Sequence, residues 1–175
     1  MTGEAGFRVL GVDPGSQRTG FALAVFRGDE VVGLELGVWR VPEGLGRADG
    51  LGFLARAMDD FLEGREVDVA AVETPFTKIN VRSALVLAEA RGALLATLGR
   101  RGVPVAEYPP ATVKKTICGA GAAEKEQVRR VMLLTVRGLR RFDLSSAGLD
   151  ATDALALAVT HQAHGRIPAM RGAGR

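Results

Sequence analysis

The chain has 175 residues, a length that predicts one domain, and its 47% hydrophobic and 25% charged residues suffice for an ordinary folded core. No apolar run approaches the roughly 20 residues of a membrane span, and the N-terminus lacks the basic and apolar segments of a secretory signal. One cysteine, Cys118, excludes an internal disulfide. We therefore expect a cytoplasmic protein without a membrane partner.

The net charge of +3 is unevenly distributed along the chain. Residues 1–108 carry 12 Lys and Arg against 15 Asp and Glu, whereas residues 109–175 carry 11 against 5. Clustered positive charge of this kind is typical of a surface that binds phosphate backbones. Taken alone, it is equally compatible with a solvated helix surface.

Apolar runs and turn residues predict the following elements in chain order. Strands are expected over 7–13, 21–27, 31–41, 67–73 and 103–108, and helices over 51–64, 82–101, from 109–110 onward, 124–136 and 150–164. Loops are expected over 42–50, 74–81 and 137–149. The order predicts an α/β fold with a mixed five-stranded sheet flanked by helices, in a single domain over 1–165. The segment 166–175 is expected to be a disordered basic tail.

Four carboxylates stand at the edges of these apolar runs: Asp13, Glu73, Asp150 and Asp153. Asp13 and Glu73 end two apolar strands. Asp150 and Asp153 are spaced i, i+3 in the first turn of a helix, so they share one face. Acids beside a core need a partner, and one divalent cation could serve all four. Oxygen-only ligands favour Mg²⁺ or Mn²⁺ over zinc.

Each motif also has a plainer interpretation. The glycine-rich segment GVDPGSQRTG, residues 11–20, could be a simple hairpin, a phosphate-binding turn or a metal site. Its pattern also occurs in actin-like ATPases and sugar kinases, but those proteins duplicate the domain, which 175 residues cannot do. Glu73 could be a solvated strand end, and the helical acids could be a cap. Four acids together make coincidence a weak explanation.

In several segments the sequence resembles the RuvC-type Holliday junction resolvases, which are ribonuclease H-like nucleases. The matching segments are GVDPGSQRTGFAL, AVETPF with Asn80, SALVLAEARGALLA, PVAEYPPATVKKTICGAGAAEKEQV and DATDALALAVTH. They extend from residue 11 to residue 161 in the family's order. The resemblance implies a ribonuclease H-like sheet and paired symmetric nicks in four-way DNA junctions during recombination and repair.

The resemblance also implies site residues. The family's metal-binding acids fall on Asp13, Glu73, Asp150 and Asp153, with two Mg²⁺ per site, which Mn²⁺ may replace, and 5′-phosphate and 3′-hydroxyl products. Its catalytic lysines fall on Lys114 and Lys125, which would neutralise phosphates. We expect DNA contacts from these lysines and from four further residues: Lys115, Lys78, Asn80 and Arg82.

An aromatic residue of the same loop, Phe76, could stack on an unpaired base at the crossover, or fold back onto the core. Ile79 stands where the family often has a basic residue, which is a departure in this loop.

A four-way junction has approximate two-fold symmetry, so we expect a homodimer, with helix 82–101 as a candidate interface. The family works beside the RuvA–RuvB branch-migration complex, and that partnership is implied by resemblance alone. Three alternatives stay open: a nuclease for RNA–DNA hybrids or another branched substrate, a non-catalytic junction-binding protein, and a small nucleotide-binding protein. The last lacks a G-x-x-x-x-G-K-[ST] loop.

Overall fold

The computed structural model describes residues 6–75 and 80–165. Within these ranges a five-stranded sheet has the order β3-β2-β1-β4-β5. The strands are β1 (Phe7–Asp13), β2 (Arg18–Arg27), β3 (Glu30–Arg40), β4 (Val69–Glu73) and β5 (Val105–Tyr108). The first three form an antiparallel meander, while β4 lies parallel to both β1 and β5. The predicted mixed sheet is confirmed.

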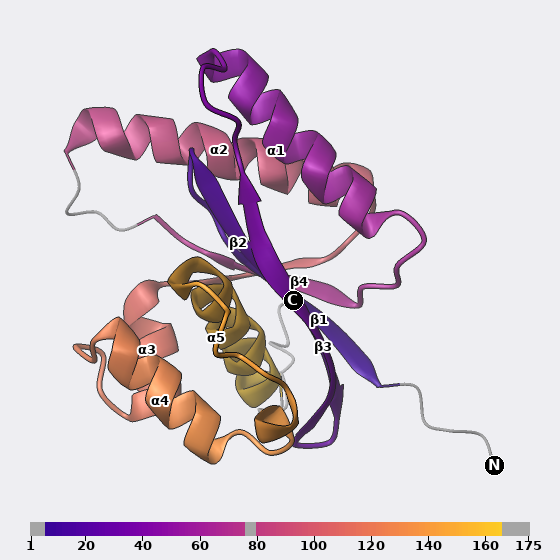
Figure 1. Ribbon diagram of the computed structural model, residues 1–175, viewed down its shortest axis with the longest axis vertical. Coiled ribbons are helices and arrows are strands. Elements are labelled where there is room, and N and C mark those ends of the chain that lie inside the picture. Colours follow the sequence, from indigo (N-terminus) through magenta and orange to yellow (C-terminus); the bar gives the residue numbers. More distant parts are fainter. Residues whose placement is uncertain (1–5, 76–79, 166–175) are drawn as a thin grey trace, which may run out of the picture.

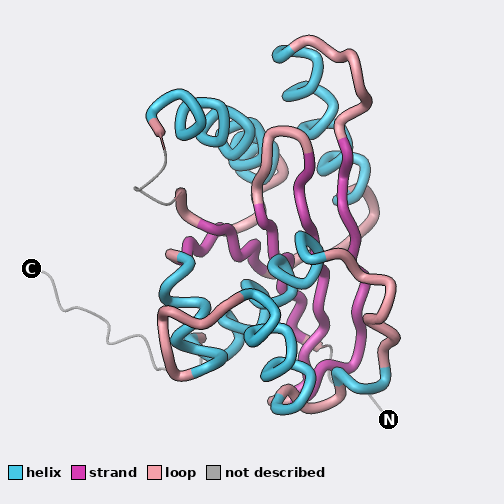
Figure 2. Tube along the Cα trace, turned by 60° about the vertical axis from the view of Figure 1, so that its left-hand side comes forward, coloured by secondary structure: helices cyan, strands magenta, loops and turns pink. Residues whose placement is uncertain are grey.

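Helices cover both faces of the sheet (Figure 1). Helices α1 (Arg47–Leu62) and α2 (Val81–Arg100) pack against each other on one face. On the other face lie α3 (Pro110–Cys118), α4 (Lys125–Thr135), α5 (Leu149–His164) and a single 3-10 turn at Leu139–Arg141. The tube view shows the strands enclosed between these two helical layers (Figure 2). Within the described residues, no helix is long and apolar enough to cross a membrane.

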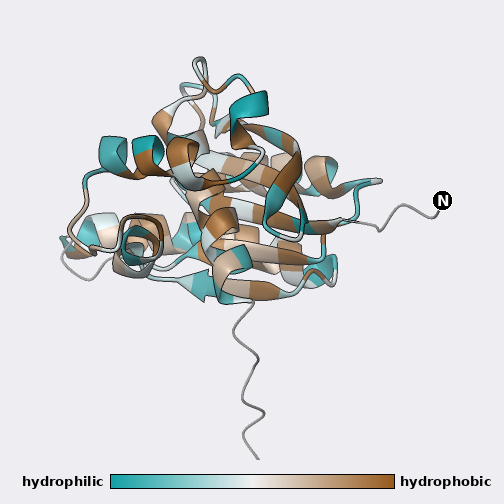
Figure 3. Cartoon of the chain, turned by 90° about the horizontal axis from the view of Figure 1, so that it is seen from below, coloured by the Kyte–Doolittle hydropathy of each residue, from teal (hydrophilic) through white to brown (hydrophobic). Residues whose placement is uncertain are grey.

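Alternation along the central strands divides the interior into two apolar clusters. Val9 of β1 faces α5 and its neighbours, whereas Leu10 and Val12 face α1 and α2. This is the two-residue period of a strand that is buried on both faces. Hydropathy colouring shows many apolar residues along the strands of the sheet, with more hydrophilic residues in the outer loops and helix ends (Figure 3).

Helix α5 lies unusually close to the sheet. An ideal Cβ on Gly11 would stand 1.8 Å from the carbonyl oxygen of Ala154, and one on Gly20 would stand 2.0 Å from that of Asp150. Only glycine permits such an approach of helix backbone to strand backbone. The two glycines therefore fix the height of α5 above β1 and β2.

The sequence placed several element boundaries incorrectly. Helix α1 begins at Arg47, within the predicted loop 42–50, because its polar first turn carries no apolar periodicity. Strand β2 begins at Arg18 rather than residue 21, since the glycine-rich segment continues directly into the β1–β2 ladder. The predicted loop 137–149 contains the 3-10 turn. The predicted disorder of 166–175 concerns residues outside those described.

Candidate active site

The two strand acids lie side by side at one edge of the sheet. Val12 of β1 pairs with Val72 of β4 in parallel register, and Asp13 and Glu73 each follow by one residue. By strand alternation, both acids share the face on which Val9 and α5 lie. The expectation that these carboxylates meet at the end of neighbouring strands agrees with the ladder.

Helix α5 brings the other two acids to the same edge. Its first turn lies against β2, where the Asp150 carbonyl approaches Gly20, and Gly20 is in turn the cross-strand partner of Asp13. Asp153 is one turn further along α5, and its side chain is only 19% exposed. The Gly20 contact thus ties the helical acids to the strand acids through backbone rather than through flexible side chains.

The turn between β1 and β2 is held by Thr19. This residue is fully buried, and its hydroxyl donates to the Gly15 carbonyl at 3.1 Å and accepts from the Gly15 N–H at 3.4 Å. These bonds fix the loop that follows Asp13. The glycine-rich segment is therefore a rigid support for the first carboxylate.

Burial and the charges of neighbouring acids raise the pKa values of the two strand acids, Asp13 and Glu73. Burial, and then the charges of Glu73 and Asp153, raise the pKa of Asp13 to about 7, against a smaller lowering effect of Lys125. Burial, and then the charge of Asp153, raise the pKa of Glu73 to about 7, although Lys125 and Lys114 oppose this. Carboxyl groups with pKa values raised in this way keep their protons until a stronger positive charge takes the place of the protons.

Basic residues stand beside the acids. The Lys125 ammonium donates a hydrogen bond to Asp153. Burial alone would lower the pKa of Lys125, but that bond and the charges of Asp153, Asp13 and Glu73 outweigh burial and raise it. Lys114 lies near enough to affect Glu73. Lys115, the next residue on α3, is exposed, and its charge does not contribute to the pKa of Asp13 or of Glu73.

The chemistry of this donor set fits a hard divalent cation, because it consists of carboxylate oxygens in a partly desolvated place. In the part of the chain described, however, no three acidic, His or Cys side chains converge closely enough to enclose an ion as they stand. Asp153 and Asp150 are instead turned toward Lys125 and Arg18, respectively. An ion at this edge would supply the charge that draws them together.

The junction-binding loop predicted before α2 is only partly described. Phe76 and Lys78 lie outside the described residues. Asn80 caps α2, since its side-chain oxygen accepts from the backbone N–H groups of Arg82 at 2.8 Å and Ser83 at 3.3 Å. Arg82 is exposed and borders a hollow of about 480 Å³ together with Ser16 from the β1–β2 loop.

Two arginines of the site were missed by sequence reasoning. Arg18 at the start of β2 approaches Asp150, with 3.7 Å between Nε and Oδ2. Arg91 of α2 donates from Nε to the Glu73 carbonyl at 3.2 Å and also bonds Glu107 of β5, so it anchors the end of β4. The only available signal for Arg18 was its place within the glycine-rich segment.

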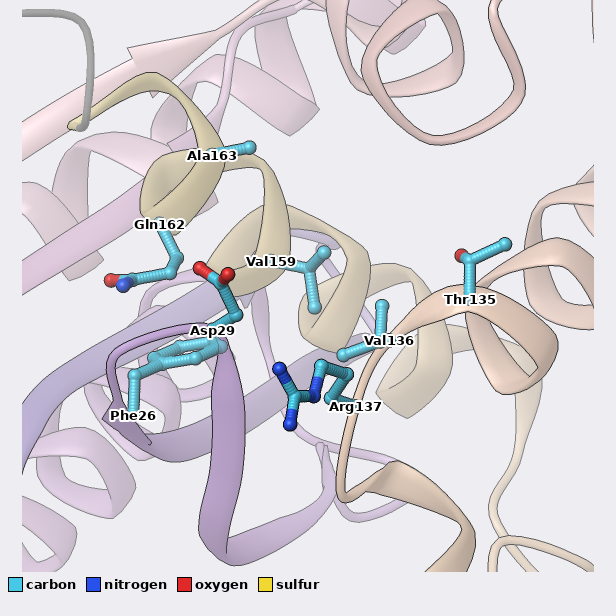
Figure 4. A pocket seen from close by; sticks show the side chains of 8 residues that line it. All are labelled: Phe26, Asp29, Thr135, Val136, Arg137, Val159, Gln162 and Ala163. Carbon is cyan, nitrogen blue, oxygen red and sulfur yellow. The ribbon is translucent and has the colours of Figure 1, made fainter.

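A different hollow, of about 310 Å³, lies at the far end of the sheet (Figure 4). It is lined by side chains from β2, the β2–β3 turn, the end of α4 and the end of α5, among them Phe26, Val136 and Gln162. Phe26 pairs with Phe7, the first residue of β1, so the hollow is separated from Asp13 by about 20 Å of strand. It does not take part in the carboxylate site.

The family model described as "Crossover junction endodeoxyribonuclease RuvC" matches residues 9–161 of this chain. Two curated proteins of the same name are similar over most of their length. The one from Azorhizobium caulinodans is 40% identical over 93% of this chain and 92% of its own. The one from Sorangium cellulosum is 41% identical over 88% of this chain and 83% of its own.

The fold is also similar to a solved structure described as T. thermophilus RuvC in complex with Holliday junction substrate. The TM-score is 0.81 at 26% identity, over 91% of this chain and 95% of the other. The matched region contains all four carboxylates and both lysines of the site.

Proposed function

The chain belongs to the RuvC family of crossover junction endodeoxyribonucleases, and from that premise we propose that its carboxylate site resolves four-way (Holliday) junctions. The product would be a pair of symmetric nicks, made during homologous recombination and DNA repair. The observation that carries the proposal is the meeting of Asp13, Glu73, Asp150 and Asp153 at one sheet edge, with Lys114 and Lys125 beside them.

We propose Mg²⁺ as the physiological metal, two ions per site, with Mn²⁺ as a substitute. Asp13 and Glu73 from the sheet and Asp150 and Asp153 from α5 would hold the ions. Bound there, the metal would supply charge that lowers the pKa of an attacking water and stabilises the departing 3′ oxygen. Hydrolysis in this sense leaves 5′-phosphate and 3′-hydroxyl ends, which a ligase can rejoin.

The chain's own residues do the remaining work. Lys125 is paired with Asp153 in the structure. With a cation bound by the carboxylates, the Lys125 ammonium would be free to face a phosphate oxygen. Lys114 is placed to do the same from α3, on the Glu73 side. Asp150 and Asp153 are the acids that pair with Arg18 and Lys125, and either could accept a proton from the attacking water.

We propose that the active form is a homodimer paired through α2. Val81 and Leu85 of this helix are large apolar side chains that are 76% and 59% exposed, an arrangement that favours a protein contact. A two-fold dimer would present two carboxylate sites to the two opposed strands of a junction. A cytoplasmic location is a proposal that rests on the sequence pattern, including the single cysteine, and cooperation with a RuvA–RuvB branch-migration complex is a proposal that rests on the family alone.

The test is cleavage of a mobile synthetic four-way junction beside linear duplex and RNA–DNA hybrid, with Mg²⁺, Mn²⁺ or EDTA. We expect paired nicks in the junction alone, at symmetric positions, and none in EDTA. Cleavage of the hybrid would instead indicate a ribonuclease. Tight junction binding without cleavage under any metal would indicate a binding protein that lacks the proposed chemistry.

A further inference from the structure

Two arginines face each other at the sheet edge that carries the acids. Arg18 begins β2 and Arg40 ends β3, and they are direct cross-strand partners in the antiparallel ladder. Alternation from Gly20, which touches α5, places both side chains on the α5 face. Both residues are exposed. The pair therefore lies on the same face and edge as the four carboxylates, but on the β3 side.

The cross-strand pair of Arg18 and Arg40 does not itself stabilise the sheet. Like charges directly opposite one another on one face of a sheet are destabilising. Arg18 obtains partial compensation from Asp150, yet the 3.7 Å separation is too long for a hydrogen bond, and its side chain is 59% exposed. Arg40 makes no ion pair with any carboxylate among residues 6–75 and 80–165. Both guanidinium groups thus keep donors available for a ligand.

Space for a ligand lies beside Arg40. Arg40 borders an open, largely polar hollow of about 310 Å³, and Ser146 and Gly148 at the start of α5 also line this hollow. Gly148 provides no side-chain cap for that helix. Asp143 also lines the hollow, and its carboxylate already accepts the Ser145 N–H at 2.9 Å. An anion would therefore favour the arginine end of the hollow over the Asp143 end.

We propose that Arg18 and Arg40 form a phosphate-binding subsite for the DNA backbone next to the scissile phosphate, a proposal that rests on the proposed function. Lys114 and Lys125 supply positive charge on the α3–α4 side of the acids, and this pair supplies it on the β3 side. A backbone crossing the carboxylates then meets cations both before and after the point of cleavage. Guanidinium groups suit this role because they bind phosphate oxygens in a bidentate manner.

The test is the salt dependence of binding for Arg18→Gln, Arg40→Gln and the double variant. The probes are a labelled four-way junction and a linear duplex, with Ca²⁺ replacing Mg²⁺ to hold the acids without productive geometry. Arg27→Gln is the matched control, since Arg27 is an exposed arginine at the opposite end of β2. Each single variant should lower the slope of log K against log salt by about 1. At 0.1 M salt this corresponds to about eightfold weaker binding, and to roughly 60-fold for the double variant.

The outcomes separate the alternatives. Slopes equal to that of Arg27→Gln would overturn the subsite. If Arg18 only neutralises Asp150, Arg18→Gln will change Mn²⁺ affinity and thermal stability without changing the slope, and Arg40→Gln will change nothing; that result also overturns it. If the wild-type protein prefers the duplex over the junction, the proposed function fails, and the slopes measured on the duplex still decide the subsite. Binding to none of them refutes both.

Discussion

Replacing Gly20 by alanine tests whether backbone contact positions the helical acids. An ideal Cβ at residue 20 would lie 2.0 Å from the Asp150 carbonyl oxygen, whereas ordinary van der Waals contact begins at 3.4 Å. Strand β2 is held in the sheet by β1 and β3, so most of the missing distance must come from a displacement of α5 by more than about 1 Å. Asp150 and Asp153 move with their helix.

The consequence for activity is larger than that for stability. Overpacking of this kind costs about 1–3 kcal/mol of folding free energy, which a domain of this size tolerates. Mg²⁺ demands near-ideal octahedral geometry, and a misplacement of about 1 Å can reduce a rate by roughly 100-fold. We therefore expect Gly20→Ala to fold, to bind junction DNA, and to cleave it at least about 100-fold more slowly.

The assay is single-turnover cleavage of a labelled junction, with urea unfolding measured on the same preparation. Gly99→Ala is the control, because a Cβ there meets nothing within 4 Å and the residue lies exposed on α2. This control should retain full activity and gain slight stability from the better helix propensity of alanine. Wild-type cleavage by Gly20→Ala would show that α5 does not transmit the contact to its acids, and would refute the reasoning.

Three further predictions concern charge and assembly. Asp13→Asn should abolish cleavage while junction affinity, measured by fluorescence anisotropy in Ca²⁺, stays within about threefold; loss of binding would instead indicate a structural role for the acid. In EDTA, the raised pKa values of Asp13 and Glu73 mean that the folded state holds protons that the unfolded state releases between about pH 4 and 7. The urea midpoint of the metal-free protein should therefore fall as pH rises through this window, and the fall should be smaller in Asp13→Asn; an unchanged midpoint between pH 5 and 8 would contradict the burial of these acids. Leu85→Glu should convert a sedimenting dimer into a monomer, whereas Leu134→Glu, a 57% exposed leucine on α4, should leave the dimer intact; equal behaviour of the two variants would exclude α2 as the interface.

The strand and helix acids could be predicted because their positions follow from local pattern. An apolar run that ends on Asp13 or Glu73 already implies a strand and its edge, and the i, i+3 spacing of Asp150 and Asp153 already implies one helix face. The mixed sheet follows from the order of such runs. These features need no knowledge of which distant segments touch.

The features that could not be predicted depend on contacts between distant segments. Gly20 was taken as part of a turn, but its real constraint is a helix that begins far downstream. Arg18 and Arg91 acquire their partners only once α5 and α2 are placed against the sheet. Helix α1 starts early because Gly46 and a polar first turn are compatible with helix yet carry no periodic signal.

The sheet also separates the acid site, on its α3–α5 side, from the layer formed by α1 and α2. All four acids lie on the α3–α5 side together with Lys114, Lys125 and Arg18, and only Arg91 reaches the end of β4 from α2. The apolar cluster beneath α1 and α2 shares no side chain with the acids. Under the proposed pairing through α2, a substitution on the outer surface of that helix, away from Arg91, would alter how the subunits pair without moving a carboxylate. Such a division would let a lineage diversify the proposed assembly surface while its chemistry stays constant, and it makes the α1–α2 layer the place where a partner could be attached or redesigned.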